Sequence, residues 1–113
     1  MENNFAEKAE IRTCPVETTL NIIGGKWKPL IIFYLLDEKK RFGQLQRCIP
    51  NVSRRMLTKH LRELEADGIV HREVYRQVPP KVEYWLTSRG RTLKPVLDTM
   101  LEWGLNYQAD ISS

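Results

Sequence analysis

The sequence of 113 residues lacks the features that define several large classes of proteins. It contains no run of about 18 apolar residues, which is the length that a membrane-spanning helix needs. Its polar and acidic start, residues 1–8, does not have the pattern of a secretory signal, so we expect a cytoplasmic protein with no membrane partner. A Gly-rich phosphate loop is also missing, because Gly24-Gly25 is too short to form one.

Histidine and cysteine are scarce, which limits catalytic and metal chemistry. His60 and His71 stand without a Cys or carboxylate at a recognised catalytic spacing, so we predict that the chain is not an enzyme. Cys14 and Cys48 are the only cysteines; they are far apart in the sequence and indicate neither a zinc site nor a thioredoxin-type motif. We therefore expect no metal and no cofactor.

Acidic residues are absent from one stretch of the chain, which carries eight basic residues instead. The net charge is only +4, and 42% hydrophobic with 28% charged residues is ordinary for one small globular domain. A block of one sign indicates a polyanionic partner, the alternative being a solvated basic surface. The basic residues of the block are Lys39, Lys40, Arg41, Arg47, Arg54, Arg55, Lys59 and Arg62.

Apolar spacing and helix-ending residues predict a mainly α-helical domain after an N-terminal arm, residues 1–13. Pro15 suits the first position of a helix, and Gly24-Gly25 ends it. A second helix, from about Lys26 to Leu36, is apolar almost all round and is therefore expected inside the core.

The middle of the sequence has the spacing of a helix-turn-helix. Phe42, Leu45 and Ile49 predict a short third helix, which Pro50-Asn51 breaks. A fourth helix then begins after the N-cap Ser53, reaches about Asp67 and stops at Gly68. Two short helices joined by a tight break are typical of DNA-binding proteins.

A β hairpin and a long helix complete the prediction. Residues 69–76 and 81–87 are predicted to form two strands joined by the Pro-containing loop 77–80. A hairpin directly after a helix-turn-helix is in the sequence position of a wing. A last helix capped by Thr87 or Ser88 should run to about Tyr107, bend at Pro95 and be followed by a tail at 108–113. Its apolar residues exceed one stripe, so we expect residues 88–107 to form a homodimer.

The fourth helix is predicted to read DNA. Leu57, Leu61 and Leu64 share one face and anchor the helix, which turns its basic residues outward. Arg and Lys reach guanine edges, and Ser and Thr contact bases or phosphates. A solvated helix face and a charged hairpin are the alternatives. The predicted DNA-binding residues are Ser53, Arg54, Arg55, Thr58, Lys59, Arg62, Arg41, Arg76 and Lys81.

The ordered motifs of residues 14–107 resemble the HxlR-type regulators, a winged-helix family related to the MarR group. The resemblance implies a dimeric regulator that binds a palindromic operator in double-stranded DNA, with the fourth helix in the major groove. The motifs that carry it are Cys14-Pro15-Val16-Glu17, Gly25-Lys26-Trp27, Arg41-Phe42-Gly43-Gln44-Leu45, Met56-Leu57-Thr58, Leu61-Arg62-Glu63-Leu64-Glu65, Gly68-Ile69-Val70, Val78-Pro79-Pro80-Lys81-Val82-Glu83-Tyr84, Leu86-Thr87 with Gly90, and Trp103-Gly104.

Some members of that family sense oxidants or electrophiles through a Cys before the first helix, where Cys14 stands here. A helix N-terminus favours the thiolate, which is the reactive form, and Arg12 is a nearby positive charge. Cys48 is the candidate disulfide partner, across a dimer; a plain buried thiol is the alternative for it.

Two further hypotheses remain open at this point. One is a regulator gated by a small molecule without redox chemistry. Its pocket would be lined by Trp27, Phe33, Tyr34, Trp103 and Tyr107. The other is a protein-interaction domain on the same scaffold, which predicts no affinity for DNA.

Overall fold

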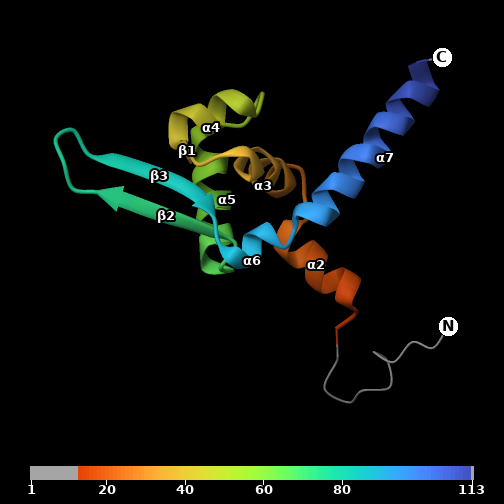
Figure 1. Ribbon diagram of the computed structural model, residues 1–113, viewed down its shortest axis with the longest axis horizontal. Coiled ribbons are helices and arrows are strands. Elements are labelled where there is room, and N and C mark those ends of the chain that lie inside the picture. Colours follow the sequence, from red (N-terminus) through yellow and green to blue (C-terminus); the bar gives the residue numbers. More distant parts are fainter. Residues whose placement is uncertain (1–12, 113) are drawn as a thin grey trace.

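The computed structural model describes residues 13–112, and Figure 1 shows how their helices and strands are arranged. The predicted class, mainly α-helical with a winged helix-turn-helix, is confirmed. In chain order the elements are α2 (Pro15–Ile23), α3 (Trp27–Asp37), β1 (Lys40–Arg41), α4 (Phe42–Cys48), α5 (Arg54–Ala66), β2 (Val70–Tyr75), β3 (Lys81–Leu86), α6 (Ser88–Arg91) and α7 (Lys94–Ser112).

Helix α3 lies at the centre of the domain. It contacts α2, α4, α5, α7 and β3, and Ile31, Ile32 and Leu35 have no exposed surface. Because α3 has aliphatic side chains all around it, other elements can pack against it on every side. The other elements are therefore placed by how each of them buries its own apolar face against α3.

Local chemistry sets most of the helix boundaries. Pro15 is the first residue of α2, where its missing N–H leaves no bond unmade. Ser53 Oγ accepts a hydrogen bond from the Met56 N–H at 3.1 Å and so begins α5. Gly68, with φ of 75°, follows the end of that helix. These boundaries were predicted from the sequence.

The turn from α4 to α5 is tied to the core. Ile49 and Val52 are almost fully buried, and Asn51 takes a positive φ of 72°, which asparagine tolerates better than most residues. Gln46 Nε2 donates a hydrogen bond to the Val52 carbonyl oxygen at 3.2 Å. The end of α4 and the start of α5 are thus joined by a short packed segment.

The wing is part of a three-stranded antiparallel sheet in the order β1-β3-β2. The hairpin pairs Val70 with Leu86 and Tyr75 with Lys81. Lys40 in β1 pairs with Tyr84 on the other side of β3. The sequence predicted the hairpin but not β1, because a strand of two residues is too short to show periodicity.

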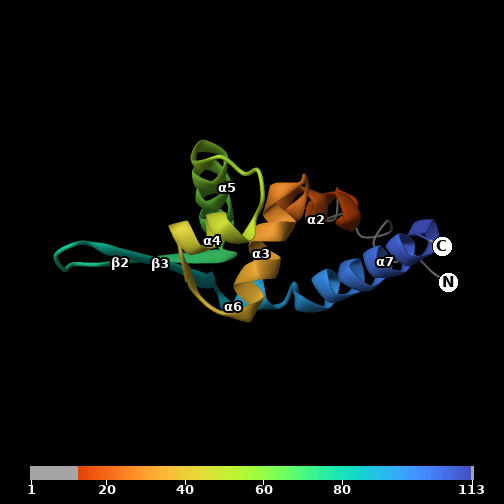
Figure 2. The ribbon, with the colours of Figure 1, turned by 90° about the horizontal axis from the view of Figure 1, so that it is seen from above.

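The end of the chain differs from the single bent helix expected there. The short α6 and the long α7 are separate helices, and Pro95 is the second residue of α7, a position that tolerates proline without a bend. Helix α7 continues past Tyr107 to Ser112, so residues 108–112 are helical. The hairpin and α7 project from the core in opposite directions (Figure 2).

Helix α6 is fixed closely against the turn that follows α5. Thr87 Oγ1 donates to the Gly68 carbonyl oxygen at 2.6 Å and accepts from the Gly90 N–H at 3.0 Å. Thr87 is therefore the N-cap, one of the two residues predicted for it. A Cβ atom on Gly90 would collide with the backbone carbonyl oxygen of Ile69.

Gly90→Ala should lower the free energy of unfolding by about 1–3 kcal/mol, because the Ile69 backbone must move to admit the new methyl group. Gly43→Ala is the matched control. Its Cβ would meet only the end of the Arg47 side chain, at 3.6 Å, and alanine favours helix by up to about 1 kcal/mol. Urea unfolding at one fixed protein concentration measures both variants. Equal stability of the two would show that α6 is free to move away from Ile69.

Candidate nucleic-acid interface

Helix α5 presents three different faces to its surroundings. Leu57, Leu61 and Leu64 are buried, as predicted, and hold the helix against the core. Arg55 and Lys59 lie on the opposite side, exposed to solvent. Among residues 13–112 neither has an ion-pair partner, so both charges are available to an external anion.

The flank of α5 that faces α3 is neutralised by an internal ion pair. Lys28 Nζ lies 2.8 Å from Glu63 Oε1, and His60 Nδ1 lies 3.7 Å from the same oxygen. The hydrogen bond from Lys28 holds the pKa of the Glu63 carboxyl below its ordinary value. The first acidic residue after the basic block is therefore paired mainly with Lys28 of α3, although its charge also acts on Lys59.

The predicted residues of α5 gather around one surface hollow of about 620 Å³. Glu63, at one side of it, is turned to Lys28. Ser53 lies just before the helix, and its hydroxyl oxygen accepts the N-cap hydrogen bond from the Met56 N–H. The hollow is lined by Arg54, Arg55, Thr58, Lys59, Arg62 and Glu63.

The remaining predicted residues lie apart from this hollow. Arg41 is exposed at the start of α4, where its backbone N–H donates to Gln44 Oε1 at 2.8 Å. Arg76 is exposed just beyond the end of β2. Lys81, at the start of β3, lies 3.6 Å from Glu83 Oε2 and 4.9 Å from the centre of the Tyr75 ring, so its charge is partly engaged.

The basic block itself divides in the structure. Lys40 is only 8% exposed, and its Nζ lies 3.9 Å from the Glu38 carboxylate. Lys39 Nζ lies 3.4 Å from Glu83 Oε1. Of Lys39, Lys40 and Arg41, only Arg41 is both exposed and without an ion pair within residues 13–112.

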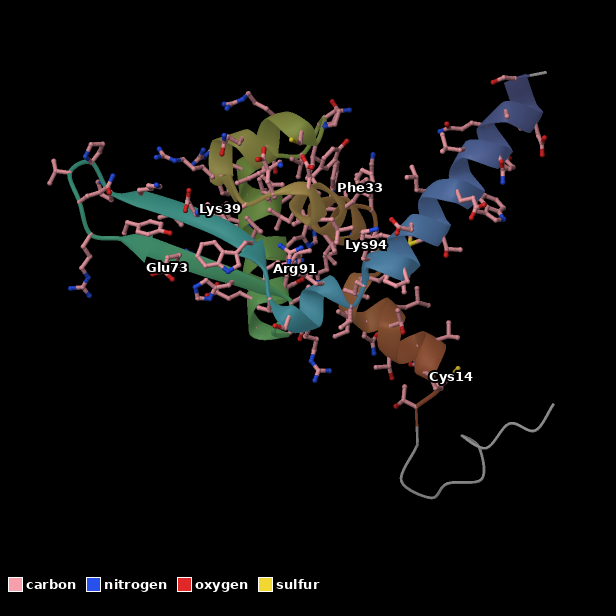
Figure 3. All side chains as sticks on the ribbon, viewed as in Figure 1. Cys14, Phe33, Lys39, Glu73, Arg91 and Lys94 are labelled. Carbon is pink, nitrogen blue, oxygen red and sulfur yellow. The ribbon has the colours of Figure 1, made fainter. Side chains whose placement is uncertain are left out.

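The side of the hairpin that carries Trp85 has a charged and aromatic cluster that sequence reasoning missed. The Trp85 ring lies 4.8 Å from the His71 ring and 5.7 Å from Lys39 Nζ, whose side chain reaches the hairpin in Figure 3. At its centre the Glu83 side chain is 11% exposed. Burial would raise the pKa of Glu83, but Tyr75 and Lys39 favour the ionised carboxylate and hold the pKa below its ordinary value. The cluster joins the base of the wing to the residue before β1.

Arg72 is a second residue that the sequence prediction left out. It lies on β2, exposed, beside the flank of α5 that faces the wing. The alternation of β2 could have identified it, because Arg72 shares a strand face with the buried Val70.

The two cysteines are free thiols on separate parts of the domain. Cys14 is exposed and is the residue before α2, where its side chain makes no capping hydrogen bond (Figure 3). Cys48 is the last residue of α4, half-buried against the core beside Ile49. Figure 1 shows the start of α2 and the whole of α4 on opposite sides of α3. Arg12, the suggested basic neighbour of Cys14, lies outside the described residues.

Helices α2 and α7 carry a large apolar surface. Trp103 is 67% exposed, and its ring stacks on Tyr107 at 5.2 Å between centres. Phe33, one of the aromatic residues suggested for a ligand pocket, borders an apolar hollow of about 200 Å³. The exposed apolar residues of the two helices are Val16, Leu20, Val96, Met100, Leu101, Trp103, Leu105, Tyr107 and Ile111.

Neither a metal-binding group of side chains nor a membrane-spanning helix is found among the described residues. Within residues 13–112, no three His, Cys, Asp or Glu side chains come together in a group that could hold a metal ion. Over the same residues, each helix is too short or too polar to serve as a membrane span.

Comparison with known proteins agrees with this geometry. The profile of the HxlR-like helix-turn-helix family matches residues 22–112. The uncharacterised HTH-type transcriptional regulator YdeP of Bacillus subtilis is 60% identical over 95 residues, 84% of this chain and 74% of that protein. The redox regulator HypR in its oxidised form is 61% identical with a TM-score of 0.79, over 82% of this chain and 96% of that chain. The reduced form of HypR is 56% identical with a TM-score of 0.83, over 88% of this chain and 98% of that chain.

Ser53→Ala should lower the free energy of unfolding by about 1 kcal/mol, because the Met56 N–H loses its acceptor. Ser53→Asp should keep the wild-type value or exceed it, since a carboxylate accepts the same bond and suits the positive end of the helix. Chemical unfolding of the three proteins measures this. If alanine were as stable as serine, the hydroxyl would not be needed for the cap.

Proposed function

We propose that this chain, which belongs to the HxlR-like helix-turn-helix family of transcriptional regulators, binds a palindromic operator as a homodimer and changes that binding when its cysteines are oxidised. Helix α5 is the element that enters the major groove, and the hairpin lies alongside it as the wing.

The observation that carries the DNA-binding surface is the charge distribution around α5. Its buried leucines fix the rotation of the helix, and that rotation turns Arg55 and Lys59 outward. No acidic residue lies in the first turn of the helix. In helix-turn-helix docking this end of the helix meets the base edges, and Arg and Lys can donate to guanine.

The homodimer rests on the apolar surface of α2 and α7. Monomeric proteins rarely expose so many large apolar side chains close together, and an identical second chain is the simplest cover. Helix α7 leaves the core on the side away from the hairpin, so contact through it keeps the wing free (Figure 2). A two-fold axis there would present two α5 helices to half-sites about 34–36 Å apart.

The redox response is supported by the two thiols. Cys14 is exposed at a helix N-terminus, a position that suits a reactive thiol, and Cys48 is half-buried on α4. Because α2 begins far from α4 within one chain, a bond between these cysteines is expected to join two chains (Figure 1). Forming it removes two protons and two electrons, which pass to the oxidant.

A regulator gated by a small molecule is the second candidate. The observation in its favour is the apolar hollow where Phe33, Leu97 and Met100 meet. At about 200 Å³ it is below the roughly 300–1,000 Å³ of typical ligand sites, and it borders the surface proposed for the second chain. Aromatic compounds that raise the melting temperature of a Cys14→Ser variant would favour this candidate.

Arg55→Gln and Lys59→Gln should each weaken binding to a duplex from upstream of the chain's own gene by about 1–3 kcal/mol, because each loses a contact to a base or phosphate. Arg91→Gln on α6 is the charge-matched control and should bind nearly as wild type does. Wild-type affinity should also fall steeply as salt rises. Fluorescence anisotropy at several salt concentrations measures all four proteins. Equal losses in all three variants would point to overall charge rather than to α5.

Diamide should convert the wild-type protein to a covalent dimer on a non-reducing gel and change its affinity for the same duplex. Cys14→Ser and Cys48→Ser should each stay monomeric, whereas co-expressed together they should give the dimer again, since one chain supplies each thiol. A dimer that persists in Cys48→Ser would indicate a bond between two Cys14 residues. No dimer and no change in affinity for wild type would rule out the switch.

A further inference from the structure

A second hollow, of about 400 Å³, lies between α5 and the hairpin. Three arginines from two elements line it: Arg54 and Arg62 on α5, and Arg72 on β2. It is distinct from the hollow on the outer face of α5, but Arg54, Thr58 and Arg62 belong to both. The two hollows therefore meet along one ridge of the helix.

Among the described residues, the positive charge lining this cleft exceeds the negative charge. In residues 13–112, none of the three guanidinium groups takes part in an ion pair. Arg54 stacks on the Phe42 ring at 4.7 Å, which holds it without neutralising it. Glu65 is the single acidic residue of the lining, and within the described residues it too has no ion-pair partner. Three like charges in one cleft repel one another unless an anion is bound.

The floor of the cleft makes that repulsion stronger. Leu61 and Tyr84 are 2% and 8% exposed and form its base together with Val82. Apolar walls lower the local dielectric constant, so a bound anion would interact with the arginines more strongly than on an open surface. The guanidinium fork also matches the oxygens of a phosphate.

The sequence places Arg72 here for a definite reason. Alternation along β2 puts Val70 and Arg72 on the face toward α5, and Val70 is buried there. Arg72 is the next residue on that face and lies opposite Tyr84, where the sheet leaves the core. A side chain at this position extends from the wing toward α5.

We propose that this cleft binds one phosphodiester group of the DNA backbone, with Arg62 and Arg72 donating to it from the helix and from the wing. This rests on the proposed DNA binding of α5. The shared ridge of the two hollows favours DNA over a free anion, because a strand that follows the outer face of α5 continues into the cleft. Such a contact carries no base information and sets the angle between α5 and the wing on the duplex.

The test measures how the affinity for duplex DNA depends on salt, for wild type, Arg72→Gln, Arg62→Gln and the double variant. Two duplexes are used: the upstream duplex and one of random sequence. Arg72→Gln should weaken binding to both by a similar factor, roughly fivefold to tenfold. The slope of log affinity against log salt should become shallower by about one phosphate contact per chain, or about two per proposed dimer. The double variant should lose less than the product of the two single losses, since both residues hold the same group.

Two controls separate this contact from general charge. Arg91→Gln removes the same charge outside the cleft and should keep the wild-type slope. Arg72→Lys keeps the charge without the planar fork, so it should keep most of the slope and lose part of the affinity. Because Arg72 is exposed, all variants should melt at nearly the wild-type temperature.

Three outcomes would overturn the proposal. If wild type binds DNA and Arg72→Gln matches it in affinity and slope, the cleft does not hold a phosphate, while the proposed function stands. If wild type binds neither duplex, the proposed function fails and the cleft proposal with it. If inorganic phosphate, against chloride of equal ionic strength, stabilises wild type but not Arg72→Gln while the DNA slope is unchanged, the cleft is a site for a free anion.

Discussion

Burial of the three leucines of α5 in the core is the constraint on which the candidate interface depends. A helix that must cover Leu57, Leu61 and Leu64 has one rotation about its axis, and that rotation decides where its charges point. Arg55 and Lys59 are thereby directed outward, and Glu63 is directed to Lys28. The apolar core thus decides which way Arg55, Lys59 and Glu63 point.

The parts of the fold that follow local rules could be predicted from the sequence. Pro15, Ser53 and Gly68 mark helix ends through their own backbone chemistry, and the leucine spacing of α5 identifies its inner face. The strand β1 and the break between α6 and α7 could not be predicted. They arise from pairing with β3 and from the contact of Gly90 with Ile69, which join residues distant in the sequence.

The same distinction applies to the candidate site. A run of basic residues in the sequence suggested one surface, but ion pairs with distant carboxylates decide which charges are free. Glu83 on β3 engages Lys81 of the same strand and also Lys39, which precedes β1 and is distant in the sequence. Arg72 was overlooked because it is separated from the basic block in sequence and joins it only through the packing of β2 beside α5.

The packed turn between α4 and α5 has a mechanical consequence. Gln46 bonds to Val52 across the turn, and Ile49 is buried within it, so the turn connects α4 to α5 through buried contacts. Cys48, the last residue of α4, directly precedes this turn. In the proposed homodimer, a disulfide at Cys48 would therefore act on this turn and could move α5 relative to the partner chain. Because the turn leads directly into the first residues of α5, such a bond would act on the end of the helix that is proposed to meet DNA.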